Sequence, residues 1–162
     1  MRHAQLVVLV VAFVNAGCPR GGGDTTPARP MTSKEVVAAA RATVEQWRQA
    51  YEVRSIEALG KLYAHNIDLV VVQEGLPLVG WSSVEGMLKD RIARYKEVHV
   101  RLKDIQVQSL AADAAVATAS MSRELGDGVT TITEYGALTV VLRQEGDGWV
   151  IVSEHYSFKR GN

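Results

Sequence analysis

Apolar residues recur at helical spacing in three parts of the chain. The first part follows a capping box at Thr32–Glu35, and its apolar stripe comprises Val36, Val37, Ala40, Val44, Trp47 and Tyr51. A spacing of three to four residues after such a box predicts an amphipathic helix. A shorter helix is predicted from Ser55, with Ile56, Leu59, Leu62 and Tyr63 facing inward. A third follows another capping box, Ser82–Glu85, and its apolar face carries Val84, Met87, Leu88, Arg91, Ile92 and Tyr95.

The rest of the pattern predicts strands. Between the second and third helices, Asn66–Gln73 is rich in β-branched residues and predicts a strand, followed by a turn at Glu74–Gly75 and a brief return strand over 76–79. From residue 97 the period becomes two, which is typical of half-buried strands. Four strands are predicted around 98–103, 114–124, 129–143 and 149–158, with glycine-containing turns at 126–128 and 146–148. Helices followed by a run of strands indicate an α+β fold with a strongly curved antiparallel sheet packed on three N-terminal helices.

The last predicted strand carries apolar residues on both faces. Alternation puts Trp149 and Ile151 on one face, and the other face carries Val150, Val152, Tyr156 and Phe158. A small sheet that helices cover on one face only needs apolar residues on that face alone. We therefore expect a homodimer whose second copy covers the convex side of the sheet. The alternative is that the C-terminal residues cover it.

The first 17 residues read as a signal peptide. Arg2 precedes nine uncharged apolar residues, 6–14, which are too few to cross a bilayer as a helix because about 20 are needed. The next residues, Asn15-Ala16-Gly17-Cys18, resemble the lipobox of bacterial lipoproteins. The resemblance implies a lipid on Cys18 and a membrane-anchored, exported protein that faces the periplasm or the cell exterior. Cleavage after Ala16 to give a soluble secreted protein, and a retained signal helix, are the alternatives.

Residues 18–31 predict a flexible tether, because they hold three of the four prolines and three consecutive glycines. Residues 32–160 then form one domain. Of the 162 residues, 47% are apolar and 22% charged, an ordinary globular balance. The 18 basic and 18 acidic residues give a net charge of zero, which disfavours a nucleic-acid partner. A lone cysteine excludes an internal disulfide and a multi-cysteine metal site.

Short motifs in the domain suggest a family. They are Trp47, Leu62-Tyr63-Ala64, Val79-Gly80, the ending Gly148-Trp149-Val150-Ile151, and His155-Tyr156-Ser157. In this order they resemble the SnoaL-like branch of the NTF2-like superfamily, especially its small DUF4440-type members, over residues 34–158. The resemblance implies a cone in which a curved sheet and three helices enclose a pocket, and often a dimer formed through the sheet. The superfamily includes isomerases, dehydratases, hydrolases and inactive members, so the fold does not set the function.

Three residues are candidates for acid–base chemistry. His155 can act as acid or base near pH 7. Strand parity puts it on the face of Trp149, Ile151, Ser153 and Ser157, which we expect to point into the cone, and puts Glu154 on the opposite face. A helper would come from Tyr63, Asp68 or Glu134. In the family, acids follow Leu-Tyr-Ala, but His65 and Asn66 stand there, and an acid appears only at Asp68. Asp68 inside an apolar strand would have a raised pKa.

The predicted pocket is aromatic. Its expected lining is Trp47, Tyr63, Trp81, Trp149, Ile151, His155 and Ser157. A metal site built from His65, Asp68 and His155 is a weak signal because the three ligands are scattered. A glycine-rich phosphate loop, a G-x-S-x-G elbow and an H-E-x-x-H motif are all absent, so no cofactor or metal is predicted.

Three functions remain open at this point. The first is an envelope-tethered domain that binds a small apolar molecule in its cone without chemistry. The second is a proton-transfer enzyme of the isomerase, dehydratase or hydrolase type, with His155, Asp68 and Tyr63 in its site. The third is a non-enzymatic dimeric scaffold. The first two require that Ile151 and His155 face an enclosed hollow.

Overall fold

The computed structural model describes residues 29–160. The predicted signal peptide and Cys18 lie outside the described residues. The helices are α1 (Ser33–Glu52), α2 (Ile56–Gly60) and α3 (Trp81–Arg94). The strands are β1 (Val70–Gln73), β2 (Leu76–Val79), β3 (Glu97–Ala111), β4 (Ala114–Gly126), β5 (Thr131–Glu145) and β6 (Gly148–Arg160). Within residues 29–160, none of the helices combines the length and the apolar character that crossing a membrane requires.

The capping box predicted for α1 is confirmed. The Thr32 hydroxyl accepts from the Glu35 amide, and the Glu35 carboxylate accepts from the Thr32 amide at 2.8 Å. These two bonds satisfy amides that the first helical turn leaves free. The buried side of α1 carries the predicted stripe at Val36, Ala40, Val44, Trp47 and Tyr51, together with Thr43 and Ala50.

The capping box predicted for α3 is wrong. The helix begins at Trp81, one residue before Ser82, and its N-cap is Gly80, which uses no side chain. Gly80 has φ 80°, a conformation that glycine adopts without strain, and its amide donates to the Leu69 carbonyl at 2.8 Å. This hydrogen bond to Leu69, the residue before β1, fixes where α3 begins. The inward residues of α3 include Val84 and Leu88, as the spacing predicts.

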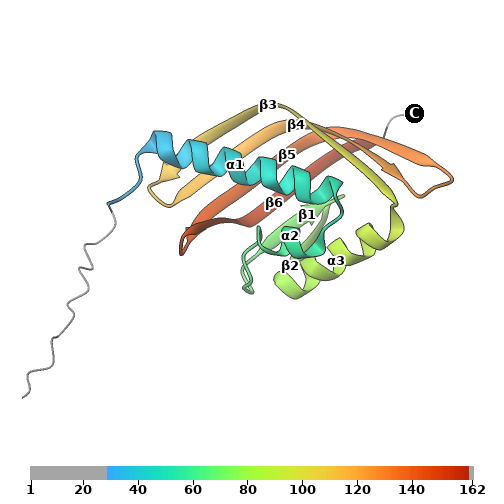
Figure 1. The fold of residues 1–162 in the computed structure, drawn as a ribbon, viewed down its shortest axis with the longest axis horizontal. Helices are drawn as coiled ribbons and strands as arrows, with labels where there is room; N and C mark the ends of the chain where they lie inside the picture. The colour runs from blue at the N-terminus through green and yellow to red at the C-terminus, as the bar shows by residue number, and fades with distance from the viewer. Residues whose placement is uncertain (1–28, 161–162) are drawn as a thin grey trace, which may run out of the picture.

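The six strands form one sheet in the order β2-β1-β6-β5-β4-β3. β1 runs parallel to β6 and the other neighbours are antiparallel, so the sheet is mixed. α1 lies across one face of the long strands, and α3 lies beside β1 and β2 (Figure 1). The predicted α+β fold class, with a curved sheet packed on helices, is confirmed, but the prediction that the sheet is antiparallel throughout is wrong at the β1–β6 pair.

The predicted strand over 66–73 is shorter in the structure and begins at Val70. Asn66 is the reason, because its side-chain oxygen accepts from the amides of Asp68 and Leu69 at 3.1 and 3.0 Å. Such a local bond replaces strand pairing with a turn. Asp68 therefore lies exposed in a turn and not inside an apolar strand.

Large aromatic side chains fill the space between α1 and the sheet. Trp47 packs against Tyr51 with ring centroids 5.2 Å apart, and against Tyr156 at 6.1 Å. These three residues and Tyr63 are each at most 2% exposed. Packed aromatic side chains therefore fill the space between α1 and the sheet. An open cavity has to lie elsewhere in the fold.

Candidate functional site

A β-bulge in β6 decides which side chains reach the interior. Val141 of β5 lies opposite Ser153, but the next residue, Leu142, lies opposite Ile151, so Val152 has no partner in β5. The bulge lies where β6 changes neighbour on its other edge, from a bridge with Tyr63 at Ile151 to β1 at Ser153. One extra residue reverses the alternation of side chains beyond it. Ile151 and Glu154 are therefore both buried.

The predicted orientation of His155 is wrong for the same reason. His155 is exposed on the outer face of the sheet, and Glu154 occupies the inward position that parity had assigned to the histidine. Ser157 is exposed as well, whereas Tyr156 is buried and Phe158 is partly buried on the inner face. His155 and Ser157 line a separate hollow at the edge of β6, together with Glu74, Gly75, Glu134, Tyr156 and Phe158.

Glu154 is held by an aromatic hydrogen-bond chain. The Trp47 indole N–H donates to the Tyr63 hydroxyl at 2.8 Å, and that hydroxyl donates to Glu154 Oε2 at 2.5 Å. Glu154 Oε1 is buried and has no hydrogen-bond partner among the described residues. Burial raises the pKa of Glu154 to about 7, although the Tyr63 hydrogen bond, Arg91 and Arg123 act in the opposite direction. The group can therefore gain or lose a proton near neutral pH.

A cavity of about 370 Å³ lies between α3, the β1–β2 hairpin and the strands β4 and β5. Its volume falls within the range of about 300–1,000 Å³ that ligand sites occupy. Leu76, Leu78, Met87, Leu125 and Ile132 supply apolar wall, with Tyr95 beside them. The charged and polar lining comprises Gln73, Glu74, Asp90, Arg91, Arg94, Arg123 and Glu134.

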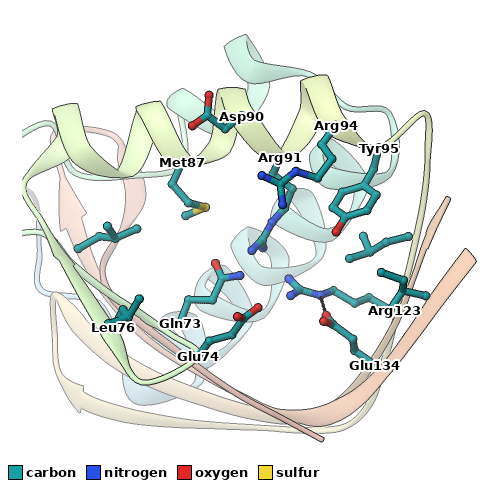
Figure 2. A pocket seen from close by; sticks show the side chains of 13 residues that line it. Gln73, Glu74, Leu76, Met87, Asp90, Arg91, Arg94, Tyr95, Arg123 and Glu134 are labelled. Carbon is teal, nitrogen blue, oxygen red and sulfur yellow. Dashed lines mark hydrogen bonds and ion pairs between the residues drawn. The ribbon is translucent and has the colours of Figure 1, made fainter. Parts of the chain in front are cut away.

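Two arginines reach into this cavity from opposite walls. Figure 2 shows the Arg91 side chain descending from α3 toward the space that Arg123 and Gln73 enter from the sheet, whereas Asp90 points away. Arg91 donates to the Tyr51 hydroxyl at 3.0 Å. Arg123 donates to Glu134 Oε2 at 2.5 Å, and its guanidinium covers the Phe158 ring at 4.0 Å. Burial lowers the pKa of Arg123, and the facing charge of Arg91 lowers it further.

The structure distributes the seven predicted lining residues over several places. Trp47, Tyr63 and Ile151 belong to the buried core. Trp81 is half-buried and stacks on the exposed His65 ring with centroids 4.3 Å apart, and Trp149 is half-buried against the core. None of these five lines the cavity between α3 and the sheet. The predicted convergence of Trp149, Ile151 and His155 on one hollow is wrong.

The predicted acid–base residues are also separated. Tyr63 is in the core, Asp68 is exposed in its turn, and His155 is exposed on the outer face. Within residues 29–160, no group of three His, Cys, Asp or Glu side chains could hold a metal ion. His99 is exposed, as its alternation with Arg101 and Lys103 indicates.

Sequence reasoning missed Glu154, Arg91, Arg123 and Gln73 as site residues. The sequence did contain a signal for Arg91 and Arg123, because each is a charged residue at a position where the pattern predicts an apolar one. Arg91 stands in the apolar stripe of α3, and Arg123 continues the inward series Ala115, Ala117, Ala119 and Met121 of β4. Glu154 carried none, since its inward position depends on the bulge at Val152.

The comparisons with known proteins agree with this architecture. A protein of the NTF2-like family from Streptomyces avermitilis, named as a candidate dehydratase, has a TM-score of 0.70 and 23% identity; the match covers 76% of this chain and 96% of that one. An NTF2-like superfamily protein from Salmonella enterica has a TM-score of 0.69 and 18% identity, over 76% and 91% of the two chains. An NTF2-like protein of unknown function from Pseudomonas putida has a TM-score of 0.67 and 23% identity, over 77% and 87%.

At these identities the solved structures show the fold alone. No curated protein sequence matches the chain. The SnoaL-like domain model matches residues 40–160, which is most of the chain. The match starts within α1 and ends with β6, so it includes every strand of the sheet. The resemblance to DUF4440-type members in particular stays a prediction. This chain belongs to the SnoaL-like domain family and has the NTF2-like fold.

Proposed function

We propose that this protein binds a small molecule in the cavity between α3, the β1–β2 hairpin and the strands β4 and β5. The observation that carries the proposal is a buried polar group at the cavity wall that lacks a partner among the described residues. Gln73 is buried, and its side-chain oxygen has no hydrogen-bond donor among the described residues. Buried polar groups in folded proteins are nearly always paired, and an unpaired one costs about 1–3 kcal/mol. A ligand that supplies the missing partner would offset this cost.

The apolar part of the wall supports binding as well. Leu76 is 70% exposed at the rim, and Ile132 is 36% exposed. Both would be removed from water by an apolar ligand group, which stabilises a complex by about 25 cal/mol for each Å² buried. A small molecule with an apolar body and a polar end therefore fits the lining, and this ligand replaces the small apolar molecule that the sequence led us to expect.

A binding assay with a cavity-filling variant tests the proposal. The probes are the eight-carbon compounds octanol, octanoate and octylamine, measured by calorimetry and by NMR of ¹³C-methionine methyl groups. Met87 lines the cavity, whereas Met121 is buried in β4 and does not. We expect at least one probe to shift the Met87 methyl signal and leave Met121 unchanged.

The variant Ile132→Trp adds bulk at the cavity wall and should abolish that binding. Leu110→Trp makes the same kind of change on the exposed end of β3, outside the lining, and should leave the binding intact. If none of the three probes binds, or if Ile132→Trp binds them as the natural chain does, this cavity is not a ligand site.

Proton-transfer catalysis is the second candidate function, and Glu154 favours it. A carboxyl group with a pKa of about 7 is suited to act as a general base at neutral pH. Tyr63 donates to this carboxyl at 2.5 Å and orients it, and burial raises the pKa of Tyr63 well above 10, so Tyr63 keeps its own proton. However, Glu154 is 1% exposed and is not part of the cavity lining, so a substrate would reach it only after buried side chains had moved. Binding without chemistry therefore has the better support.

A proton-exchange assay distinguishes the two functions without a known substrate. Ketones and carboxylic acids would be incubated with the protein in D₂O, and the loss of α-proton signals followed by NMR. An enzyme of this class would exchange them, and Glu154→Gln would stop the exchange by removing the base. His155→Gln is the matched control, since His155 is exposed on the outer face. Exchange that His155→Gln abolishes and Glu154→Gln preserves would contradict this assignment of the base.

We further propose that the protein is exported and anchored through a lipid on Cys18, and that it forms a homodimer. The nine-residue apolar segment and the lone cysteine after it support export and anchoring. The support for the dimer is narrower than the sequence pattern implied, because Ile151, Tyr156 and Phe158 all lie on the inner face. Val72, Val141 and Val152 remain half-buried outside the core. Light scattering on the natural chain and on Val141→Asp tests the dimer, which the aspartate should dissociate.

A further inference from the structure

We infer that the ligand of the cavity carries a carboxylate, which is held between Arg91 and Arg123. The inference rests on the proposed binding function and deepens it by naming the chemical class of the ligand. It depends on three features of the cavity: an arginine without an acidic partner, a second arginine that faces it, and an apolar wall beside both.

Two arginines of the cavity lining, Arg91 and Arg94, form no ion pair within the described residues, and Arg91 is the one that faces Arg123. Arg91 projects from the inward side of α3, between the turns that carry Leu88 and Tyr95. Its one side-chain hydrogen bond to the described part of the protein goes to the Tyr51 hydroxyl, which is neutral at pH 7 because burial raises its pKa further above 10. Within residues 29–160, the ion pairs formed by arginines do not include Arg91. Burial lowers its pKa, but Tyr51 and the carboxyls of Glu154 and Glu134 outweigh this effect and raise it, although neither carboxyl forms an ion pair with Arg91.

Arg123 adds a second positive charge across the cavity. Its carboxylate partner in the described part of the chain is Glu134, at 2.5 Å, and the pair is almost completely buried. Arg91 and Arg123 repel each other, which contributes to the lowered pKa of Arg123. The nearby carboxyl of Glu154 compensates this charge only when it is ionised. A ligand anion between the two guanidinium groups would relieve the repulsion and use donors that face the cavity.

The remaining lining narrows the anion to a monocarboxylate with an apolar body. Glu134 and Glu74 also border the cavity, so a phosphate dianion would bring its second charge close to two carboxylates. A carboxylate carries one charge and matches the planar fork of a guanidinium. Leu78, Met87 and Leu125 offer the rest of the molecule an apolar surface. An amphipathic carboxylic acid combines the two requirements.

Calorimetry at pH 7 with four probes tests the inference on the natural chain. Octanoate, octanol and octylamine share the same apolar body, and inorganic phosphate has none. Hydrogen bonds to charged groups contribute about 1.5–3 kcal/mol, so we expect octanoate to bind about tenfold to a hundredfold tighter than octanol. Octylamine and phosphate should bind more weakly than octanol and octanoate, respectively.

A variant pair assigns the effect to Arg91. Arg91→Gln removes the charge and should weaken octanoate about tenfold or more while octanol binding changes little. Lys89→Gln removes the same charge from the same helix, but Lys89 pairs with Glu85 and does not line the cavity, so octanoate affinity should be preserved. Arg91→Lys keeps the charge without the fork and should fall between them.

The outcomes separate this inference from the proposed function. Octanol binding that equals octanoate binding would overturn the carboxylate and leave the ligand cavity standing. Tighter binding of octylamine or of phosphate would also overturn it. The probe comparison uses the natural chain, so it decides the question even if Arg91→Gln fails to fold. If no probe binds, the cavity itself is not a site.

Discussion

Glu154 and His155 are neighbours in β6 that face opposite sides of the sheet. The Glu154 carboxyl is buried and accepts from the Tyr63 hydroxyl at 2.5 Å, while the His155 ring is exposed. The bulge at Val152 produces this arrangement. As a consequence, the group whose protonation changes the interior is a carboxyl, and substitutions at Glu154 and His155 should have very different effects.

The natural chain should lose stability relative to Glu154→Gln as the pH rises toward 7. The pKa of Glu154 is about 7 in the folded protein, whereas a glutamate in the unfolded chain has a pKa of 4.5, so between these values the folded protein keeps a proton that the unfolded chain has lost. The contribution of Glu154 to stability is thus present below pH 4.5 and is lost as pH rises through about 7. At 1.36 kcal/mol for each pKa unit, the loss is on the order of 3 kcal/mol.

Urea unfolding between pH 4 and 8 measures this effect as the difference between the natural chain and Glu154→Gln. Because glutamine does not titrate, the variant should gain stability relative to the natural chain as pH rises through this window. Glu97→Gln, at an exposed position of β3, should run parallel to the natural chain. A pH-independent difference between the natural chain and Glu154→Gln would show that Glu154 has an ordinary pKa.

Tyr63→Phe should destabilise the protein and raise the pKa of Glu154 beyond about 7. The Tyr63 hydroxyl bonds both the Trp47 indole and Glu154, so its removal leaves two buried groups unpaired. We expect a loss of about 1–3 kcal/mol in the free energy of unfolding. The pKa should rise because the hydrogen bond from Tyr63 lowers it in the natural chain.

Tyr135→Phe is the control for this change, because Tyr135 is 56% exposed on the outer face. It should change the free energy of unfolding by less than about 0.5 kcal/mol. Equal stability of the two variants, with the pH window of Glu154 unmoved, would contradict the hydrogen-bond chain from Trp47 to Glu154.

The sequence predicted those elements whose signals are local. The cap at Thr32 and the spacing from Val36 to Tyr51 lie within one helix, so α1 could be placed almost to the residue. The sequence did not predict the start of α3, because it depends on a hydrogen bond from the Gly80 amide to the Leu69 carbonyl, which lies outside the helix. Asn66 shortened β1 through bonds to its own neighbours, a local signal that the β-branched run concealed.

The site was harder to predict because it depends on contacts between distant elements. Alternation places side chains correctly along β4, where Arg123 continues an inward series, but fails along β6 at Val152. The bulge arises where one edge of β6 passes from the Tyr63 bridge to β1, and no residue type marks that change. Arg91 was visible as the one charge in an apolar stripe, and its partner Tyr51 lies 40 positions earlier.

Cys18→Ser should release the protein from the membrane fraction. Thioether attachment of a lipid requires the cysteine thiol, so the variant should lose labelling by a radioactive fatty acid and leave the membrane once its signal segment is cleaved after Ala16. Fractionation and labelling in a bacterial host measure both. Ser33→Ala, beyond the predicted tether, should remain labelled and membrane-bound. If the natural chain is exported, carries no label and leaves the membrane fraction, the soluble secreted alternative holds; an unlabelled chain that stays in the membrane fraction indicates the retained signal helix.

Gly136→Ala should strongly destabilise the protein, because β6 approaches Gly136 of β5 very closely. A Cβ at this position would lie 1.8 Å from the Ser157 carbonyl oxygen, a backbone atom that cannot move without disturbing the pairing of Gly136 with Phe158. We expect a loss of about 3 kcal/mol or more in urea unfolding. Gly86→Ala is the matched control: nothing lies within 4 Å of a Cβ there, and alanine should stabilise α3 by up to about 1 kcal/mol. A Gly136→Ala protein as stable as the natural chain would mean that β5 and β6 separate at this point.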